Sequence, residues 1–316
     1  MTPGRAERVA APSPVPIATT PQPPLDVLIL TRDEEENLPY ALASVAGVAA
    51  AVWVVDSHST DRTASIAEAA GARVVTHEFT GYPAQRNWAL RNLPFTGDWV
   101  LVLDADETVS PELAAELPAA LAAAPPDLAG FYLKRRFIFL GRWLRHGGYY
   151  PVWLLRVMRH RVARCEDRAV DEHFVVEGRT ARLHHDLLHE DRRPLSRWVE
   201  RHDQYAGLAA ETLAGARGGG AVAGRWTGTQ AERKRWWYDR VYRRAPVGMR
   251  AVAYFVYRYV VRGGFLDGRE GFLYHLMQGL WYRALIDAKL LELRRRAPRD
   301  HAGAAGVRTP DPAPER

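Results

Sequence analysis

Cysteine is almost absent from this sequence: Cys165 is the single one in 316 residues. One thiol forms no disulfide within the chain, and it cannot build a cysteine-rich zinc site. Proteins that depend on a disulfide framework or on cysteine-bound zinc are therefore excluded. So little cysteine fits a reducing compartment, and we expect the cytoplasm.

Long apolar runs are also missing. The best candidate for a membrane-spanning helix, residues 247–261, is shorter than the roughly 20 residues needed and carries Arg250 and Arg258. Residues 1–24 are rich in Pro, Ala and Thr and lack the apolar centre of a signal peptide. We expect residues 1–24 and 297–316 to be disordered tails, and no internal repeat is visible between them.

The rest of the composition is that of a globular protein. With 47% hydrophobic and 25% charged residues, the chain can build a core in one large domain, or in one domain with an appendage. The net charge is +6, and arginine is concentrated in the C-terminal half. A nucleic acid, an anionic membrane surface or a phosphorylated substrate would each suit this charge.

Short apolar runs alternate with helical patterns in the first half of the chain. We predict strands at 25–31, 51–55, 73–76 and 99–103, with helices at 39–46, 62–70 and 83–93 and another beginning at Ser110. This alternation is typical of βαβ units, so it predicts an α/β fold with a mixed, mainly parallel sheet and helices on both faces. Further strands at 130–139, 152–158, 173–176 and 181–188 lack long helices between them and predict an antiparallel addition.

Two carboxylates end the strand at 99–103. Asp104 and Asp106 can point to one side, because side chains alternate along an extended chain. The carboxyl ends of strands are where open α/β sheets bind ligands. Carboxylate oxygens suit Mg²⁺ or Mn²⁺ held partly by substrate phosphates. A solvated turn is the alternative for this short motif.

Other strand ends carry acids too. Glu34 and Glu35 follow the first strand, and Asp56 ends the second. Arg86, in the helix at 83–93, could supply the positive charge that a diphosphate needs; otherwise it is a surface residue of that helix. Because parallel strands end at one edge of the sheet, we expect these side chains to converge on a ligand.

The C-terminal part interleaves arginine with aromatic residues. We predict a helix at 194–213, and residues 233–296 read as basic, aromatic, amphipathic helices. Such helices lie in membrane interfaces, although a nucleic-acid surface would also be basic and aromatic. The apolar content of residues 247–261 and 285–293 favours the membrane, and a helical hairpin that caps the sheet is a third interpretation.

Four motifs, in order along the chain, carry a family resemblance. They are Leu30-Thr-Arg-Asp-Glu-Glu-Glu-Asn37, Val54-Val-Asp-Ser-His-Ser-Thr-Asp61, Ala84-Gln-Arg-Asn87 and Leu103-Asp-Ala-Asp-Glu107. Together they resemble glycosyltransferase family 2, which has the Rossmann-like GT-A fold. Within that family the chain is similar to lipopolysaccharide core glycosyltransferases. The resemblance covers roughly residues 25–293.

The resemblance implies a nucleotide-sugar donor, most simply a UDP-sugar, and a divalent cation, Mg²⁺ or Mn²⁺. Asp104 and Asp106 match the family's metal–diphosphate motif. Asp56 matches the aspartate that meets the nucleoside, and Thr31 and Glu35 match the turn after the first strand. By the same resemblance, the chain is a hexosyltransferase.

The resemblance also implies a catalytic base. Inverting transfer needs a carboxylate that accepts the proton of the acceptor hydroxyl. Glu172 aligns with the family's base, and Asp171 stands where the family has histidine, so two carboxylates compete for the role. His189 resembles a histidine that often supplies a third metal ligand.

These observations predict an inverting glycosyltransferase domain at 25–192 and a membrane-associating helical region at 193–296. The expected partners of the protein are the nucleotide-sugar donor, a lipid-linked glycan acceptor of cell-envelope or lipopolysaccharide biosynthesis, and an anionic membrane surface. We expect no nucleic acid among them. We expect the protein in the cytoplasm, peripherally bound to the inner face of the cell membrane. A polyprenyl-phosphate sugar synthase and a basic nucleic-acid-binding protein are the alternatives.

Overall fold

The computed structural model describes residues 25–167, 172–215, 224–228, 230–240 and 242–296. The two predicted tails, 1–24 and 297–316, and the candidate base Asp171 lie outside these residues.

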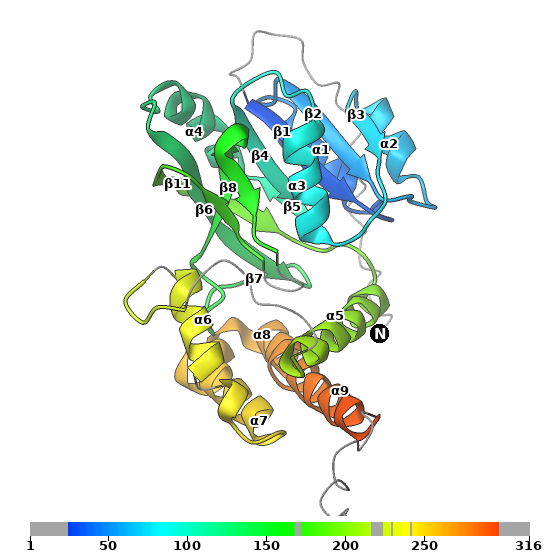
Figure 1. Ribbon diagram of the computed structural model, residues 1–316, viewed down its shortest axis with the longest axis vertical. Helices are drawn as coiled ribbons and strands as arrows, with labels where there is room; N and C mark the ends of the chain where they lie inside the picture. The colour runs from blue at the N-terminus through cyan, green and yellow to red at the C-terminus, as the bar shows by residue number, and fades with distance from the viewer. Residues whose placement is uncertain (1–24, 168–171, 216–223, 229, 241, 297–316) are drawn as a thin grey trace, which may run out of the picture.

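A mixed sheet forms the centre of the described chain (Figure 1). Its strands lie in the order β3–β2–β1–β4–β8–β6–β11–β5, and β7 adds to β6. They are β1 (Leu25–Thr31), β2 (Ala51–Asp56), β3 (Arg73–Thr76), β4 (Trp99–Asp104), β5 (Glu107–Val109), β6 (Leu128–Phe139), β7 (Arg142–Leu144), β8 (Val152–Arg159) and β11 (Arg179–His189). The first four strands pair in parallel, as continuous apolar runs favour.

Helices cover both faces of the parallel half. They are α1 (Leu38–Val45), α2 (Thr63–Ala69), α3 (Tyr82–Asn92) and α4 (Pro111–Ala122). Because side chains alternate along a strand, Val27 and Ile29 pack in one core cluster with α1 and α4, whereas Leu28 packs in another with α3. The predicted start of α4 is confirmed, since the Leu113 N–H donates to the Ser110 side chain at 3.2 Å. The predicted α/β fold class is thus confirmed.

The second half of the sheet differs from the prediction in its pairing. β8 is antiparallel to β4 and β6, but β11 runs parallel to β6, so the addition is not wholly antiparallel. The strand predicted at 173–176 is β10 (Phe174–Val176), which pairs with β9 (Ala163–Cys165) in a separate two-stranded sheet. The short strands β5 and β7 were not predicted, because three residues carry too little pattern.

Five helices lie below the sheet (Figure 1). They are α5 (Leu195–Leu213), α6 (Gln230–Arg240), α7 (Met249–Val256), α8 (Gly268–Tyr274) and α9 (Tyr282–Arg296). π-Helical segments extend α7 over Tyr257–Val261 and join α8 to α9 over His275–Trp281. Trp198 and Tyr274 pack against Phe139 and Leu144, and this cluster attaches the helices to the sheet. None of the helices in the described part is both long and apolar enough to cross a bilayer.

Candidate active site

The parallel strands bring Thr31, Asp56 and Asp104 to one edge of the sheet. Thr31 lies beside Asp56, and Leu30 lies beside Asp104, in the pairing of β1 with its two neighbours. The Thr31 hydroxyl donates to Asp56 at 2.9 Å, and the Ser59 N–H donates to the same carboxylate at 2.9 Å. Asp56 is therefore buried and held in one orientation, as a residue that positions a ligand needs to be.

Two arginines hold Asp104. Arg86 of α3 donates from Nη2 at 2.8 Å, and Arg156 of β8 donates from Nη2 at 2.6 Å. The other terminal nitrogen of Arg86 pairs with Glu172. Burial alone would raise the pKa of Asp104, but Arg156 and Arg86 together hold that pKa well below its usual value. The structure thus joins three of the predicted site residues in one ion-pair network.

A fully buried carboxylate, Glu107, lies behind this network. It accepts a hydrogen bond from Arg156 at 2.8 Å, and burial opposes ionisation while Arg156 lowers its pKa. Neither Glu107 nor Arg156 was predicted as a site residue. Arg156 could have been suspected, because it is a lone charge within the apolar strand predicted at 152–158.

His189, at the end of β11, faces two carboxylates. Its Nε2 lies 3.7 Å from Asp106 and its Nδ1 lies 3.7 Å from Glu107. Nδ1 is buried and makes no hydrogen bond. Histidine ligands of metals commonly have a carboxylate at the second nitrogen, so Asp106 and His189 fit a divalent cation, with Glu107 orienting the ring.

Asp104, the third predicted metal ligand, is arranged differently from Asp106 and His189. Both carboxylate oxygens of Asp104 accept hydrogen bonds from arginines. Within the described residues, no group of three or more His, Cys, Asp or Glu side chains is arranged to hold a metal ion. The residues present therefore offer two ligands from the protein, and Mg²⁺ commonly takes the remainder from substrate phosphates and water.

The turn after β1 directs Glu34, rather than Glu35, to the site. Glu35 pairs with the exposed Arg62 at 3.0 Å, away from the other acids. Glu34 pairs with Arg193 at 2.6 Å. Its pKa is raised to about 7, first by burial and then by the charge of Asp106. The role predicted for Glu35 in ligand binding stays a prediction.

Helix α5 completes one wall of the site. Its Arg201 lies 3.8 Å from Asp106 and pairs with Asp191. Its Tyr205 hydroxyl lies 3.1 Å from the Tyr82 hydroxyl, at the start of α3. These contacts were not predictable from the sequence, since they depend on how α5 is placed against the sheet.

The fold and site define a class: an α/β domain that carries carboxylates and buried arginines at the edge of the sheet where such folds bind ligands. The chain carries a glycosyltransferase family 2 domain, because the model of that family, Glycosyl transferase family 2, matches residues 26–175. The predicted family is confirmed for this part of the chain.

Curated relatives share this part of the chain. An uncharacterized glycosyltransferase of Rickettsia bellii is 39% identical over 103 residues, which cover 33% of this chain and 34% of the relative. An uncharacterized glycosyltransferase of Mycobacterium bovis is 40% identical over 96 residues, 29% of this chain and 42% of the relative. The similarity thus spans only about a third of the Rickettsia relative's length.

Among solved structures, the chain is similar to a mannosyltransferase from Pyrobaculum calidifontis in complex with GDP-Man and Mn²⁺. That likeness has a TM-score of 0.48 and 17% identity, and covers 89% of this chain and 90% of the other. TarS residues 1–349 of S. aureus give a TM-score of 0.40 and 13% identity, covering 86% and 91% of the two chains.

Proposed function

We propose that the protein is an inverting glycosyltransferase that moves a sugar from a nucleotide-sugar, most simply a UDP-sugar, to a lipid-linked glycan acceptor. The observation that carries the proposal is the network at the sheet edge of the family 2 domain, where Arg86 bridges Asp104 and Glu172. It sets a candidate base beside the candidate donor site, as transfer between two bound substrates requires.

The proposed reaction is a single displacement. The acceptor hydroxyl oxygen bonds to the anomeric carbon while the bond from that carbon to the diphosphate breaks. Glu172 accepts the hydroxyl proton, and the electron pair of the broken bond leaves with the nucleoside diphosphate. Arg86 and Arg156 provide fixed positive charge near the departing group.

A divalent cation belongs to this proposal. Asp106 and His189 would hold it, and Glu107 would orient His189. When bound, such a cation stabilises the negative charge that develops on the diphosphate. Arg86 pairs with one oxygen of Glu172 and thereby makes that carboxylate a weaker base, so we expect donor binding to draw Arg86 toward the phosphates and free Glu172 to accept a proton.

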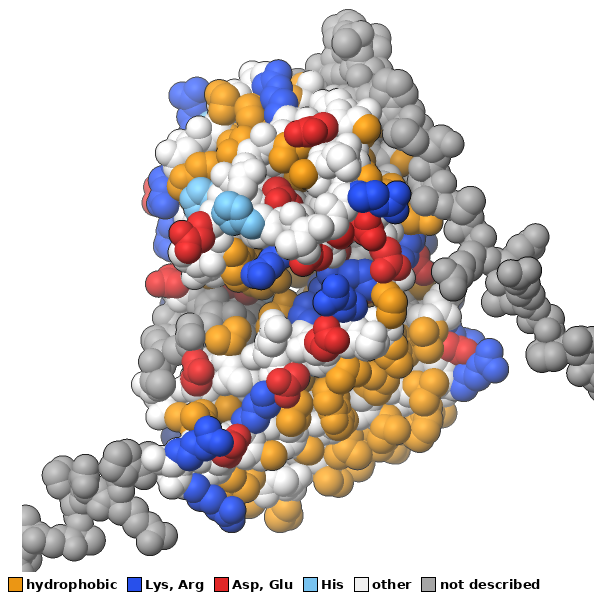
Figure 2. All heavy atoms as spheres, turned by 90° about the vertical axis from the view of Figure 1, so that its right-hand side faces the viewer, with side chains coloured by type: hydrophobic (Ala, Val, Ile, Leu, Met, Phe, Trp, Pro, Cys, Tyr) orange, Lys and Arg blue, Asp and Glu red, His pale blue; other side chains and the backbone are white. Residues whose placement is uncertain are grey.

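The acceptor side is supported by an apolar surface on the C-terminal helices. Figure 2 shows hydrophobic side chains gathered over the lower part of the molecule. On α7 and its π-helical extension, exposed apolar residues line one shallow groove: Met249, Val252, Val256, Tyr257 and Val261. Large exposed apolar patches mark interaction sites, and an amphipathic face of this kind suits the surface of a bilayer. This surface supports the membrane part of our proposal, which is that the enzyme acts in cell-envelope or lipopolysaccharide synthesis at the inner face of the membrane.

The test is protection against thermal unfolding by UDP-, GDP- and dTDP-sugars, each with MnCl₂ or with EDTA. One donor should raise the melting temperature of the wild-type protein, and only with the metal. Asp106→Asn should abolish this shift, whereas Asp98→Asn, which removes an exposed acid at the opposite end of β4, should leave it unchanged. Equal protection of both variants would contradict the proposed site.

A further inference from the structure

Two arginines between the sheet and the helices lack an acidic partner. Arg258, in the π-helical extension of α7, donates from Nη1 to the Tyr254 hydroxyl at 2.6 Å, and its Cζ lies 4.1 Å from the centroid of the Tyr149 ring. Arg135, on β6, is half-buried. The Nε atoms of both arginines are buried without a hydrogen bond. Within the described residues, no carboxylate forms an ion pair with either side chain.

In the part of the chain that the structure describes, the three most deeply buried arginines are each paired with an acid. Arg86 and Arg156 pair with the acids of the site, and Arg250 pairs with Asp287. Removing a cation from water is unfavourable unless an anion compensates it. Arg258 and Arg135 both lie close enough to Tyr149 to act electrostatically on its hydroxyl, so together they mark a place where an anion from outside the chain would be stabilised.

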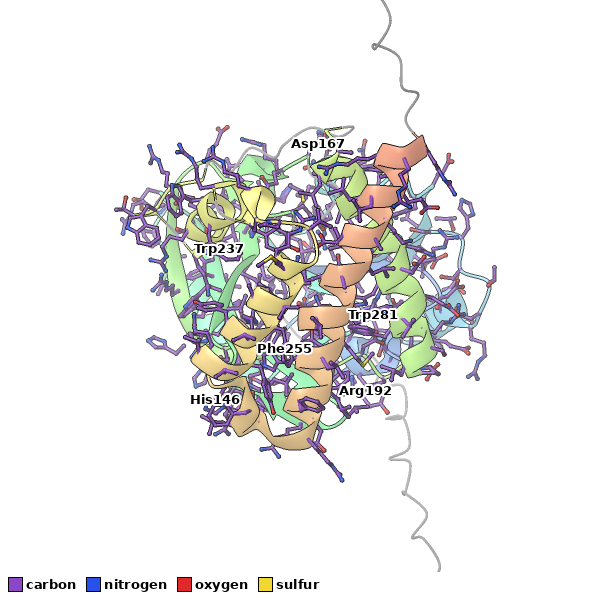
Figure 3. All side chains as sticks on the ribbon, turned by 90° about the horizontal axis from the view of Figure 1, so that it is seen from below. His146, Asp167, Arg192, Trp237, Phe255 and Trp281 are labelled. Atoms are coloured by element: carbon purple, nitrogen blue, oxygen red, sulfur yellow. The ribbon has the colours of Figure 1, made fainter. Side chains whose placement is uncertain are left out.

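The loop between β7 and β8 leaves room beside these cations. Gly148 has a φ of +80°, and a Cβ built on it would lie 3.6 Å from Nε of Arg258 and 3.5 Å from Nη2 of the exposed Arg262. Two guanidinium groups thus border a position that has no side chain. The loop is fixed to the helix end, since Gly147 N–H donates to the Arg262 carbonyl at 2.9 Å and His146 bonds Asp267 at 2.7 Å. Figure 3 shows His146 at this end of the helices.

This cationic position lies between the apolar surface and the candidate active site. On the outer side, Val261 and Phe265 flank Arg262 in the chain and are both more than half exposed. On the inner side, the Phe137 ring lies 6.0 Å from the Tyr149 ring and 5.2 Å from the His189 ring. The rings of Tyr149 and Phe137 thus connect the cationic position to His189 of the candidate active site.

We propose that Arg258 and Arg262, beside Gly148, bind the phosphate group of the acceptor, with Arg135 adding positive charge from the sheet. The acceptor would thus be a phosphate ester or diphosphate ester of a lipid. Guanidinium groups match the geometry of phosphate oxygens, and the buried Tyr149 hydroxyl, which lacks a hydrogen-bond partner, could donate as well. This proposal rests on the proposed function, whose donor site lies apart from it at Asp106.

The test measures binding of geranyl phosphate, inorganic phosphate and geraniol to the full chain by calorimetry. Geranyl phosphate should bind, and geraniol should bind far more weakly or not at all. Arg258→Gln and Arg262→Gln should each weaken geranyl phosphate binding roughly tenfold or more, the scale of a charge-assisted hydrogen bond. Arg269→Gln is the matched control, because Arg269 is an exposed arginine of the same region that pairs with Glu270. Since Arg262 is exposed, its variant should fold even if Arg258→Gln does not.

The outcomes separate the sources of the phosphate. Inorganic phosphate that binds as tightly as geranyl phosphate, with the same arginine dependence, supports a phosphate site for a soluble acceptor. Equal binding of geraniol and geranyl phosphate, or unchanged binding by both variants, overturns the proposal. So does binding confined to phosphatidylglycerol vesicles and absent with geranyl phosphate, since that describes a bilayer headgroup contact. Thermal protection by a nucleotide-sugar would persist in all these cases, so the proposed function is tested separately.

Discussion

Arg86 pairs with Asp104 through one terminal nitrogen and with Glu172 through the other. The carboxylate predicted to accept a proton is thus connected to the carboxylate that ends β4 by a single guanidinium group. Binding of a diphosphate would compete for that group, which links occupation of the donor site to the release of Glu172.

Replacing the proposed base tests this relationship. Glu172→Gln should lower the turnover rate by about a hundredfold or more, because a general base commonly contributes that much. Donor binding should barely change, and Asp171→Asn should have a milder effect than Glu172→Gln. Initial-rate kinetics would measure both, with the exposed Glu177→Gln as control. Full activity of Glu172→Gln and Asp171→Asn would indicate an acceptor that is itself anionic, as in a polyprenyl-phosphate sugar synthase.

Removing Arg156 should destabilise the fold. Arg156→Met leaves the fully buried Glu107 without its cation, and breaking a buried ion pair commonly costs about 3–5 kcal/mol. Arg159→Met, on the same strand, removes a pair with the exposed Asp98 and a hydrogen bond to the Leu128 carbonyl, and should cost less, about 1–2 kcal/mol. Urea denaturation of the two variants would give both values. Similar losses of stability in both variants would show that another group compensates the negative charge of Glu107.

The glycine before the proposed phosphate site should not tolerate a side chain. A Cβ on Gly147 would lie 2.2 Å from Cε1 of His275, which is fully buried, and Gly147 has a φ of +63°. Gly141 has a φ of +77° but nothing within 4 Å of such a Cβ. Gly141→Ala should therefore cost about 1–2 kcal/mol from the backbone alone. Gly147→Ala should cost about 1–3 kcal/mol more through overpacking, seen as a lower melting temperature.

Mild acid should destabilise the helical layer. Burial lowers the pKa of His202 to about 4, and burial together with Arg258 lowers the pKa of His275 to about 4. Between about pH 6.5 and pH 4 the unfolded chain therefore binds more protons than the folded protein at these groups. Their contribution to stability is complete above that window and is lost as the pH falls through it, by about 1.4 kcal/mol per pH unit and group. Urea denaturation at several pH values would show this slope, and His202→Gln should reduce it.

Sequence patterns were sufficient for elements whose signal is local. The strands β1, β2 and β4 are apolar runs, of which β2 and β4 end in acids, and the predicted helices with stated bounds begin and end within a residue or two of those observed. Contacts between residues far apart in the chain could not be predicted from such local patterns. Arg86 and Glu172 are 86 residues apart, and nothing near either residue indicates the other.

The burial of charged side chains was the second feature that sequence patterns did not predict. Glu107 reads as part of a solvated turn, yet Arg156 from another strand allows it to be fully buried. The choice of Glu34 over Glu35 depends on how the turn after β1 meets Arg193, a residue far along the chain. The acids of the site were therefore predictable as a group, but not their individual partners.

The contacts of Arg193 and Arg201 limit how this protein could be recombined with its relatives. Both arginines follow the last strand of the sheet, and they lie against Glu34 and Asp106, two acids that repel each other. A chimera that kept the sheet and replaced everything after residue 192 would leave these acids without nearby cations. We expect such chimeras to assemble a working site only when the donated helices bring basic side chains to the same two positions.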